Sequence, residues 1–185
     1  MIALLRWASL GAGLLLAAAD HGATVKLNES GEARVGGIAP SFGLWGVNGD
    51  GPFVLDKLRK LPSPAAMLVT FGASWCGPCK EGLPRLKKFT EQHRELRMVL
   101  IDVEADAAEA QAWVKKLGLT CTVLHDKFKV AATRYGAANI LPRTFLVDPR
   151  GRVRAIYSIE GTDLEAVLAQ DLSAALGAGN ASAPR

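Results

Sequence analysis

The chain has 185 residues, a formal net charge of +4 and three cysteines. This length fits one domain with short appendages, whose core can hold the fold without disulfide staples or a structural metal. Basic and acidic residues are interspersed, and no basic stripe carries interleaved aromatics, which argues against nucleic-acid binding. The low, odd cysteine count is unlike that of a disulfide scaffold, so it favours chemistry at particular cysteines.

The N-terminal residues 1–19 are almost wholly apolar, and Arg6 is the charged side chain among them. Ala17-Ala18-Ala19 supplies the small residues that a signal peptidase accepts, just before Asp20. A membrane-spanning helix needs roughly 20 apolar residues, so this run is short for a permanent anchor. We therefore expect a signal peptide over 1–19, or else an uncleaved anchor. Both place the domain outside the cytosol, in the periplasm.

Residues 20–35 are mostly small or polar and are predicted to form a linker. A single domain is expected over 36–176, followed by a flexible tail over 177–185. Near the start of the domain, two short apolar runs flank Asn48-Gly49-Asp50-Gly51, a sequence typical of a tight turn. This pattern predicts an N-terminal β-hairpin over about 42–55.

Strands and helices are predicted to alternate through the middle of the chain, because short apolar runs are separated by segments with helical spacing. The predicted strands cover 66–71, 98–103, 120–124, 144–147 and 153–157. One predicted helix starts at Cys76, and the others cover 105–117, 127–135 and 163–176. The turn at 148–151 should make the last two strands antiparallel. The order predicts an α/β fold, a central mixed sheet with helices on both faces.

The chemistry is expected at Trp75-Cys76-Gly77-Pro78-Cys79-Lys80, where a buried strand meets a helix. A thiolate is the species that attacks a disulfide, and the free N–H groups of a first helical turn stabilise its charge. Cys79 lies three residues after Cys76 on the same helical face, close enough to form a small disulfide ring. We therefore predict that Cys76 attacks and that Cys79 resolves the mixed disulfide.

Other interpretations of the cysteine pair are weaker. A zinc site would need a second pair of ligands at suitable spacing, which the sequence lacks. A structural disulfide that closes so short a loop adds little stability. The alternative functions are a copper chaperone, because soft thiolates favour Cu(I), and a thiol peroxidase in which Cys76 reacts with peroxide.

Cys121 and His125 lie four residues apart near one predicted strand, nominally on one face. Together with the pair they could form a metal site, or Cys121 could serve as a redox relay. A buried core thiol is the favoured interpretation, because free cysteine is among the most buried residue types. We expect no metal and no cofactor other than a redox-active disulfide between Cys76 and Cys79.

The motif at 75–80 resembles the active-site helix of the thioredoxin superfamily. Ala39-Pro40-Ser41-Phe42 and Leu141-Pro142-Arg143-Thr144 are similar to segments of one branch, the exported TlpA/ResA-like thiol–disulfide oxidoreductases. A helix–strand unit over 105–124 resembles the insertion that distinguishes this branch. The resemblance covers about 36–174 and implies a thioredoxin-like fold.

The resemblance further implies a cis peptide bond between Leu141 and Pro142 beside the cysteines, with the backbone of Leu141 pairing with an extended substrate segment. It implies a substrate-binding surface that also includes Trp75, Gly77 and Pro78. The implied partners are protein disulfides. The Gly-Pro dipeptide suggests a reducing couple, with the direction of electron flow left open, and an exported reductant would need a membrane-linked electron donor. We expect the protein to be a monomer.

Three positions depart from the family pattern. Thioredoxins carry a buried Asp six residues before the first cysteine, where this chain has Thr70. ResA-like members often have a Glu three residues after the second cysteine, where this chain has Gly82, and a large aromatic four residues before the first, where it has Gly72. The residue that assists proton transfer during resolution is therefore unassigned.

Overall fold

The structure is a computed structural model that describes residues 32–60, 66–159, 161 and 163–180. The predicted leader, most of the predicted linker and the last five residues of the predicted tail lie outside these ranges. In the part of the chain that is described, none of the helices combines the length and the apolar character needed to cross a membrane.

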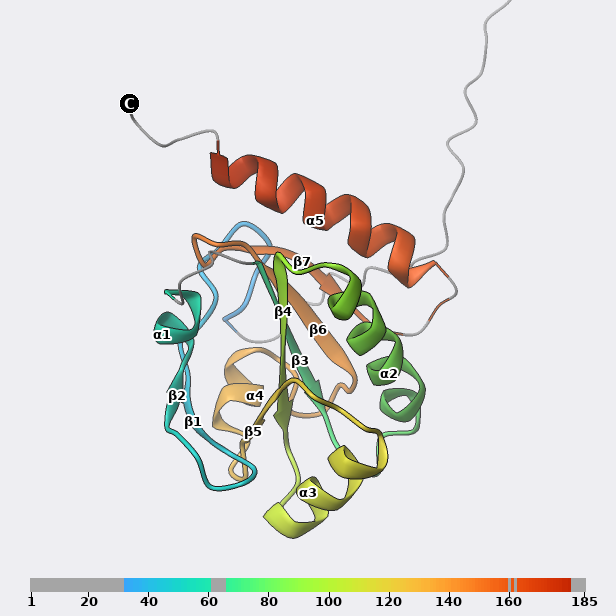
Figure 1. The fold of residues 1–185 in the computed structure, drawn as a ribbon. Helices are drawn as coiled ribbons and strands as arrows, with labels where there is room; N and C mark the ends of the chain where they lie inside the picture. Colours follow the sequence, from blue (N-terminus) through green and yellow to red (C-terminus); the bar gives the residue numbers. More distant parts are fainter. Residues whose placement is uncertain (1–31, 61–65, 160, 162, 181–185) are drawn as a thin grey trace, which may run out of the picture.

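The described residues form a seven-stranded sheet in the order β2-β1-β5-β4-β3-β6-β7, with helices around it (Figure 1). The elements are β1 (Gly43–Gly46), β2 (Phe53–Val54), α1 (Leu55–Arg59), β3 (Ala66–Gly72), α2 (Gly77–Gln92), β4 (Leu96–Asp102), α3 (Ala107–Lys116), β5 (Thr122–His125), α4 (Val130–Arg134), β6 (Arg143–Val147), β7 (Val153–Tyr157) and α5 (Leu164–Asn180). Strands β3, β4 and β5 run parallel, while β6 is antiparallel to β3 and β7 to β6. The predicted mixed α/β fold is confirmed.

The N-terminal hairpin forms around the predicted turn, with β1 and β2 antiparallel. On its other side β1 pairs with β5, where Trp45 lies opposite His125. The hairpin therefore extends the sheet past the inserted unit, which consists of α3 and β5.

Two apolar clusters fill the two faces of the sheet. Helices α2, α3 and α5 contribute to one cluster, which also contains Cys76 and Cys79. Helices α1 and α4 contribute to the other, with an aromatic group around Tyr135. Figure 1 shows α2 and α4 on opposite sides of the central strands. Strand β3 is buried at every residue, which explains why it consists almost wholly of apolar residues.

Several boundaries differ from those predicted. Helix α4 begins at Val130, not at Lys127, because its N-cap residue Lys129 has a left-handed backbone with a φ of 54°. The Asp126 carboxylate accepts hydrogen bonds from the N–H groups of Val130 (2.9 Å) and Ala132 (2.8 Å) in the first turn. Helix α5 continues to Asn180, past the predicted end at 176. At the other terminus Ala33, within the predicted linker, is buried in the second apolar cluster, so the packed domain begins before residue 36.

Tyr135→Phe is expected to lower the free energy of unfolding by about 1 kcal/mol. The fully buried Tyr135 hydroxyl donates to the Pro40 carbonyl at 2.7 Å, so its removal leaves that oxygen without this donor while the ring packing stays. Urea unfolding would measure the loss. Tyr135→Ala, which also empties the ring position, should cost about 3–5 kcal/mol. Equal stability of Tyr135→Phe and the parent would show that this hydrogen bond contributes nothing.

Candidate active site

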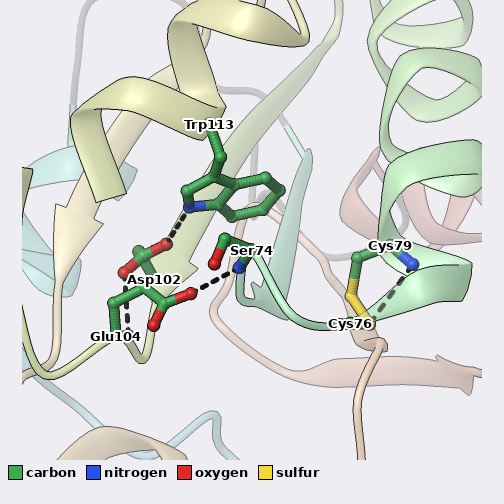
Figure 2. Close-up of a disulfide and its surroundings, with 6 residues drawn as sticks. All are labelled: Ser74, Cys76, Cys79, Asp102, Glu104 and Trp113. Atoms are coloured by element: carbon green, nitrogen blue, oxygen red, sulfur yellow. Dashed lines mark hydrogen bonds between the residues drawn. A yellow bond between two sulfur atoms is a disulfide. The ribbon is translucent and has the colours of Figure 1, made fainter. Parts of the chain in front are cut away.

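The cysteine pair lies where β3 ends and α2 begins. Cys76 is the N-cap residue of α2, and its Sγ accepts a hydrogen bond from the Cys79 N–H at 3.2 Å (Figure 2). Pro78 lies in the first turn, where a backbone N–H would have no partner within the helix, so the missing N–H of proline removes no helical hydrogen bond. A disulfide joins Cys76 to Cys79, with Cα atoms 5.3 Å apart. The sequence therefore located the start of the helix correctly.

The two cysteines differ in what surrounds them. Cys79 is fully buried, whereas Cys76 keeps 4 % exposure beside the exposed residues Gly77 and Pro78. Trp75 is 59 % exposed, and the Lys129 ammonium lies 5.9 Å from the centre of its ring. A reaction partner can therefore approach this disulfide from the Cys76 side only.

The segment before β6 reaches the same end of the sheet. The peptide bond between Leu141 and Pro142 is cis, as the family resemblance implies. Strand β6 pairs with β3 up to Arg143 opposite Phe71, and continuing this register by one residue puts Pro142 beside Gly72. Pro142 is buried and Leu141 half-buried. The predicted site residues of the two segments thus share one end of the sheet.

At two positions where the family often carries an acid, Thr70 and Gly82, neighbouring side chains pack against the residue that is present. Thr70 is fully buried and accepts a hydrogen bond from the Thr144 hydroxyl at 3.1 Å. At Gly82 an added Cβ would lie 2.4 Å from Ile159 Cδ1, so Ile159 fills the space of a side chain there. A Glu at position 82 would require Ile159 to move.

A family model described as the AhpC/TSA family matches residues 35–156. The chain belongs to the AhpC/TSA family. It is 27 % identical over 150 residues, covering 78 % of this chain and 83 % of the relative, to "Thiol-disulfide oxidoreductase ResA" from Geobacillus thermodenitrificans (strain NG80-2).

Solved structures agree with this assignment. A thiol:disulfide interchange protein of the thioredoxin family from Chlorobium tepidum TLS is 26 % identical with a TM-score of 0.61, covering 76 % of this chain and 96 % of that one. A thiol-disulfide oxidoreductase from Bacteroides fragilis NCTC 9343 is 26 % identical with a TM-score of 0.60, covering 72 % and 98 % of the two chains. With a disulfide at the start of α2, this AhpC/TSA-family protein is a thiol–disulfide oxidoreductase.

Near the cysteine turn the oxidoreductase also holds the buried carboxylates of Asp102 and Glu104, which sequence reasoning did not single out (Figure 2). The N–H of Ser74, two residues before Cys76, donates to Glu104 Oε1 at 2.5 Å. Asp102 Oδ2 accepts from Trp113 Nε1 at 2.6 Å, and Asp102 Oδ1 accepts from the N–H of Glu104 at 2.9 Å. The available signal was their position, because both acids stand where a buried parallel strand ends.

Burial raises the pKa of Asp102 to about 6. The hydrogen bonds from the Glu104 N–H and the Trp113 indole favour the ionised carboxylate and oppose this rise, whereas the Glu104 charge adds to it.

Cys121 and His125, which were considered together in the sequence, make different contacts in the structure. Cys121 lies just before β5, half-buried against the core cluster, and burial raises the pKa of its thiol to about 11. A thiol that stays protonated at neutral pH is a poor redox relay. His125 Nε2 instead forms a hydrogen bond with the Glu104 carbonyl oxygen at 2.9 Å.

Gly82→Ala is expected to destabilise the protein by about 1–3 kcal/mol, because its Cβ has no room against Ile159. Chemical denaturation would measure the change. Gly177→Ala is the matched control, since nothing lies within 4 Å of the added Cβ and this helical site should gain up to about 1 kcal/mol. A Gly82→Ala protein as stable as the parent would contradict the tight packing on Ile159.

Asp102→Asn is expected to change how stability depends on pH. In an unfolded chain the Asp pKa is about 3.9, so the folded protein holds this proton more tightly. The raised pKa therefore makes stability fall as the pH rises from about 4 through about 6. Asp102→Asn should remove this decline, about 1–3 kcal/mol between pH 4 and 7 in urea unfolding. Asp106→Asn, at an exposed N-cap, should keep it, and parallel curves for Asp102→Asn and the parent would refute the assignment.

Proposed function

We propose that this oxidoreductase reduces protein disulfides outside the cytosol, with Cys76 as the attacking residue and Cys79 as the resolving residue. One observation carries the proposal, the asymmetry of the disulfide at the start of α2. Cys79 is fully buried, whereas Cys76 borders the exposed residues Gly77 and Pro78. A thiolate at Cys76 can meet a substrate disulfide, and Cys79 can meet only Cys76.

The reaction has two exchange steps. In the reduced protein, the Cys76 thiolate attacks one sulfur of the substrate disulfide, that bond breaks, and the other substrate sulfur leaves as a thiolate that takes up a proton. Cys79 then loses its proton and attacks Cys76 Sγ, and the first substrate sulfur leaves. The substrate gains two electrons, and the protein ends with the Cys76–Cys79 disulfide that the structure contains.

The helix start favours charge on Cys76. The Cys79 N–H already points at Cys76 Sγ at 3.2 Å, and a hydrogen bond to an ionised sulfur is stronger than one to a neutral sulfur. The first turn of α2 carries no acidic residue, so no acid of its own opposes the positive end of the helix dipole. Both effects stabilise the Cys76 thiolate.

The substrate surface is proposed to consist of Trp75, Gly77, Pro78, Leu141 and Pro142. The exposed Trp75 ring offers apolar contact area next to Cys76. The Leu141 backbone would pair with an extended segment of the substrate, as in recognition by strand addition. Protein chains with an accessible disulfide in an extended segment fit this arrangement.

The direction of electron flow and the location rest on the sequence. The Gly-Pro dipeptide between the cysteines is that of thioredoxin, whose potential is about −270 mV, and this supports a reducing couple. The predicted leader over 1–19 supports an exported, periplasmic protein. A reductant there needs resupply of electrons, so a membrane-linked donor is part of the proposal, as is a monomeric protein whose redox-active disulfide is its only cofactor.

Cys79→Ser is expected to trap a mixed disulfide between Cys76 and a substrate protein, because the resolving thiol is gone. Non-reducing gels of protein from the native compartment would show the adduct, and mass spectrometry would locate it at Cys76. Cys76→Ser should trap nothing and reduce insulin no faster than the uncatalysed reaction. Cys121→Ser, the matched control, should keep the parent rate of insulin reduction. Absence of any adduct in the native compartment would reject the exchange role.

The direction has its own test, the equilibrium of the Cys76–Cys79 pair with glutathione. A potential below about −250 mV is expected for a reductant. A value near about −120 mV would make the protein an oxidant and overturn the direction while leaving the exchange chemistry in place.

A further inference from the structure

Gly72, the last residue of β3, lies close to both Cys79 and Trp113. The position that a Cβ would take at Gly72 is 3.5 Å from Cys79 Sγ and 3.5 Å from Trp113 Cη2. The indole and the sulfur are therefore both within van der Waals reach of one point beside Gly72. Trp113 is 7 % exposed, so it shields this side of Cys79 from water.

Asp102 holds the other edge of the same indole. Trp113 Nε1 donates to Asp102 Oδ2 at 2.6 Å, and the aspartate is fully buried (Figure 2). Asp102 is also the register partner of Gly72 in the parallel pairing of β3 with β4. Partners in a parallel pair point to the same face, and neighbouring strands are about 4.8 Å apart. The Asp102 carboxylate therefore lies on the face of the sheet that carries Cys79, one strand away.

The charged groups around Asp102 come from its own strand end and from the next strand. Glu104 is buried two residues on, and its negative charge adds to that of Asp102. His125 on β5 is the register partner of Asp102 and weakens the negative field when it is protonated. Helix α3 contributes the neutral Trp113 indole, and α2 contributes Cys79.

We propose that Asp102 is a positioning residue for Cys79, which holds Trp113 against the thiol and opposes ionisation of Cys79 through its negative charge. The inference rests on the proposed function, because it concerns the resolving step. A carboxylate and a thiolate repel each other strongly where water is excluded. Cys79 therefore stays protonated in the reduced protein, and Cys76 is the thiolate that meets the substrate.

The position of Asp102 also bears on Thr70, which stands where thioredoxins carry a buried Asp. A buried carboxylate is absent from β3 at that position, but one is supplied from β4 by Asp102, on the same face of the sheet. When Cys79 attacks Cys76 Sγ, Cys79 gives up its proton, the Cys76–Cys79 bond forms, and the substrate sulfur leaves as a thiolate that takes up a proton. The Asp102 charge thus delays loss of the Cys79 proton until the mixed disulfide offers an electrophilic sulfur.

The test is the pKa of Cys79 in the reduced full chain with Cys76→Ser and Cys121→Ser, so that Cys79 is the remaining thiol. The ¹³Cβ chemical shift of Cys79 followed against pH reports its ionisation without requiring access to the buried sulfur. Adding Asp102→Asn should lower this pKa by about one pH unit, since one negative charge nearby is removed. Asp106→Asn removes an exposed carboxylate before α3 and should leave the pKa of Cys79 unchanged.

A second comparison separates charge from packing. Trp113→Phe removes the hydrogen bond to Asp102 but keeps an aromatic ring and the carboxylate, so the pKa of Cys79 should stay near that of the parent. An equal drop in Trp113→Phe and Asp102→Asn would show that loosened packing is the cause and would overturn the charge role. If Asp102→Asn fails to fold, Asp102→Ser supplies the second neutral variant.

An unchanged or raised pKa of Cys79 in a folded neutral variant would overturn the inference. That failure differs from failure of the proposed function, because the titration involves no substrate. A parent protein that traps no substrate, yet whose Cys79 pKa depends on Asp102, would lose the proposed function and keep the inference.

Discussion

Strands β3 and β4 pair in parallel along their whole length, from Ala66 opposite Leu96 to Gly72 opposite Asp102, and this register determines where the parts of the site lie. The cysteine-bearing turn leaves from the end of β3, and the two buried acids stand at and just after the end of β4. Parallel strands end at the same edge of a sheet, so two segments separated along the chain meet without a long loop. A shift of the register by one residue would turn Asp102 to the opposite face of the sheet, away from Cys79.

Burial then gives the two cysteines different roles. Cys76 caps a helix beside exposed residues, so it can carry charge and meet a partner. Cys79 lies in the apolar cluster, where an ion is costly, and the buried Asp102, with a pKa of about 6, is negative at neutral pH. The two cysteine side chains are chemically identical, but their surroundings favour the thiolate at Cys76 and the protonated thiol at Cys79.

The positions that depart from the family pattern are filled by coherent packing and not left as gaps. Ile159 occupies the space that a side chain at Gly82 would need, and Trp113 approaches the space above Gly72. Large apolar side chains from other segments of the chain lie next to the positions where the family often carries a Glu or an aromatic residue. A site of this kind can keep its reaction while the groups around the sulfurs come from other strands and helices.

Features that depend on residues close together in the chain could be predicted from the amino-acid sequence. The helix start at Cys76, the hairpin turn at 48–51 and the antiparallel last strands follow from local geometry, and each is present in the structure. The cis bond before Pro142 came from family resemblance and not from spacing. Element ends were less predictable, because the start of α4 depends on the left-handed backbone of Lys129 and on hydrogen bonds from its first turn to the Asp126 carboxylate.

The groups that surround Cys79 could not be predicted in this way, because they come together through the three-dimensional fold. Trp113 and Asp102 are 11 residues apart, and Ser74 and Glu104 are 30 apart, so no local pattern links them. Their contacts arise because the sheet register and the packing of α3 bring separate segments to one edge. Desolvation at that edge, which no sequence motif encodes, is what raises the pKa of Asp102 and makes its charge felt by a neighbouring thiol.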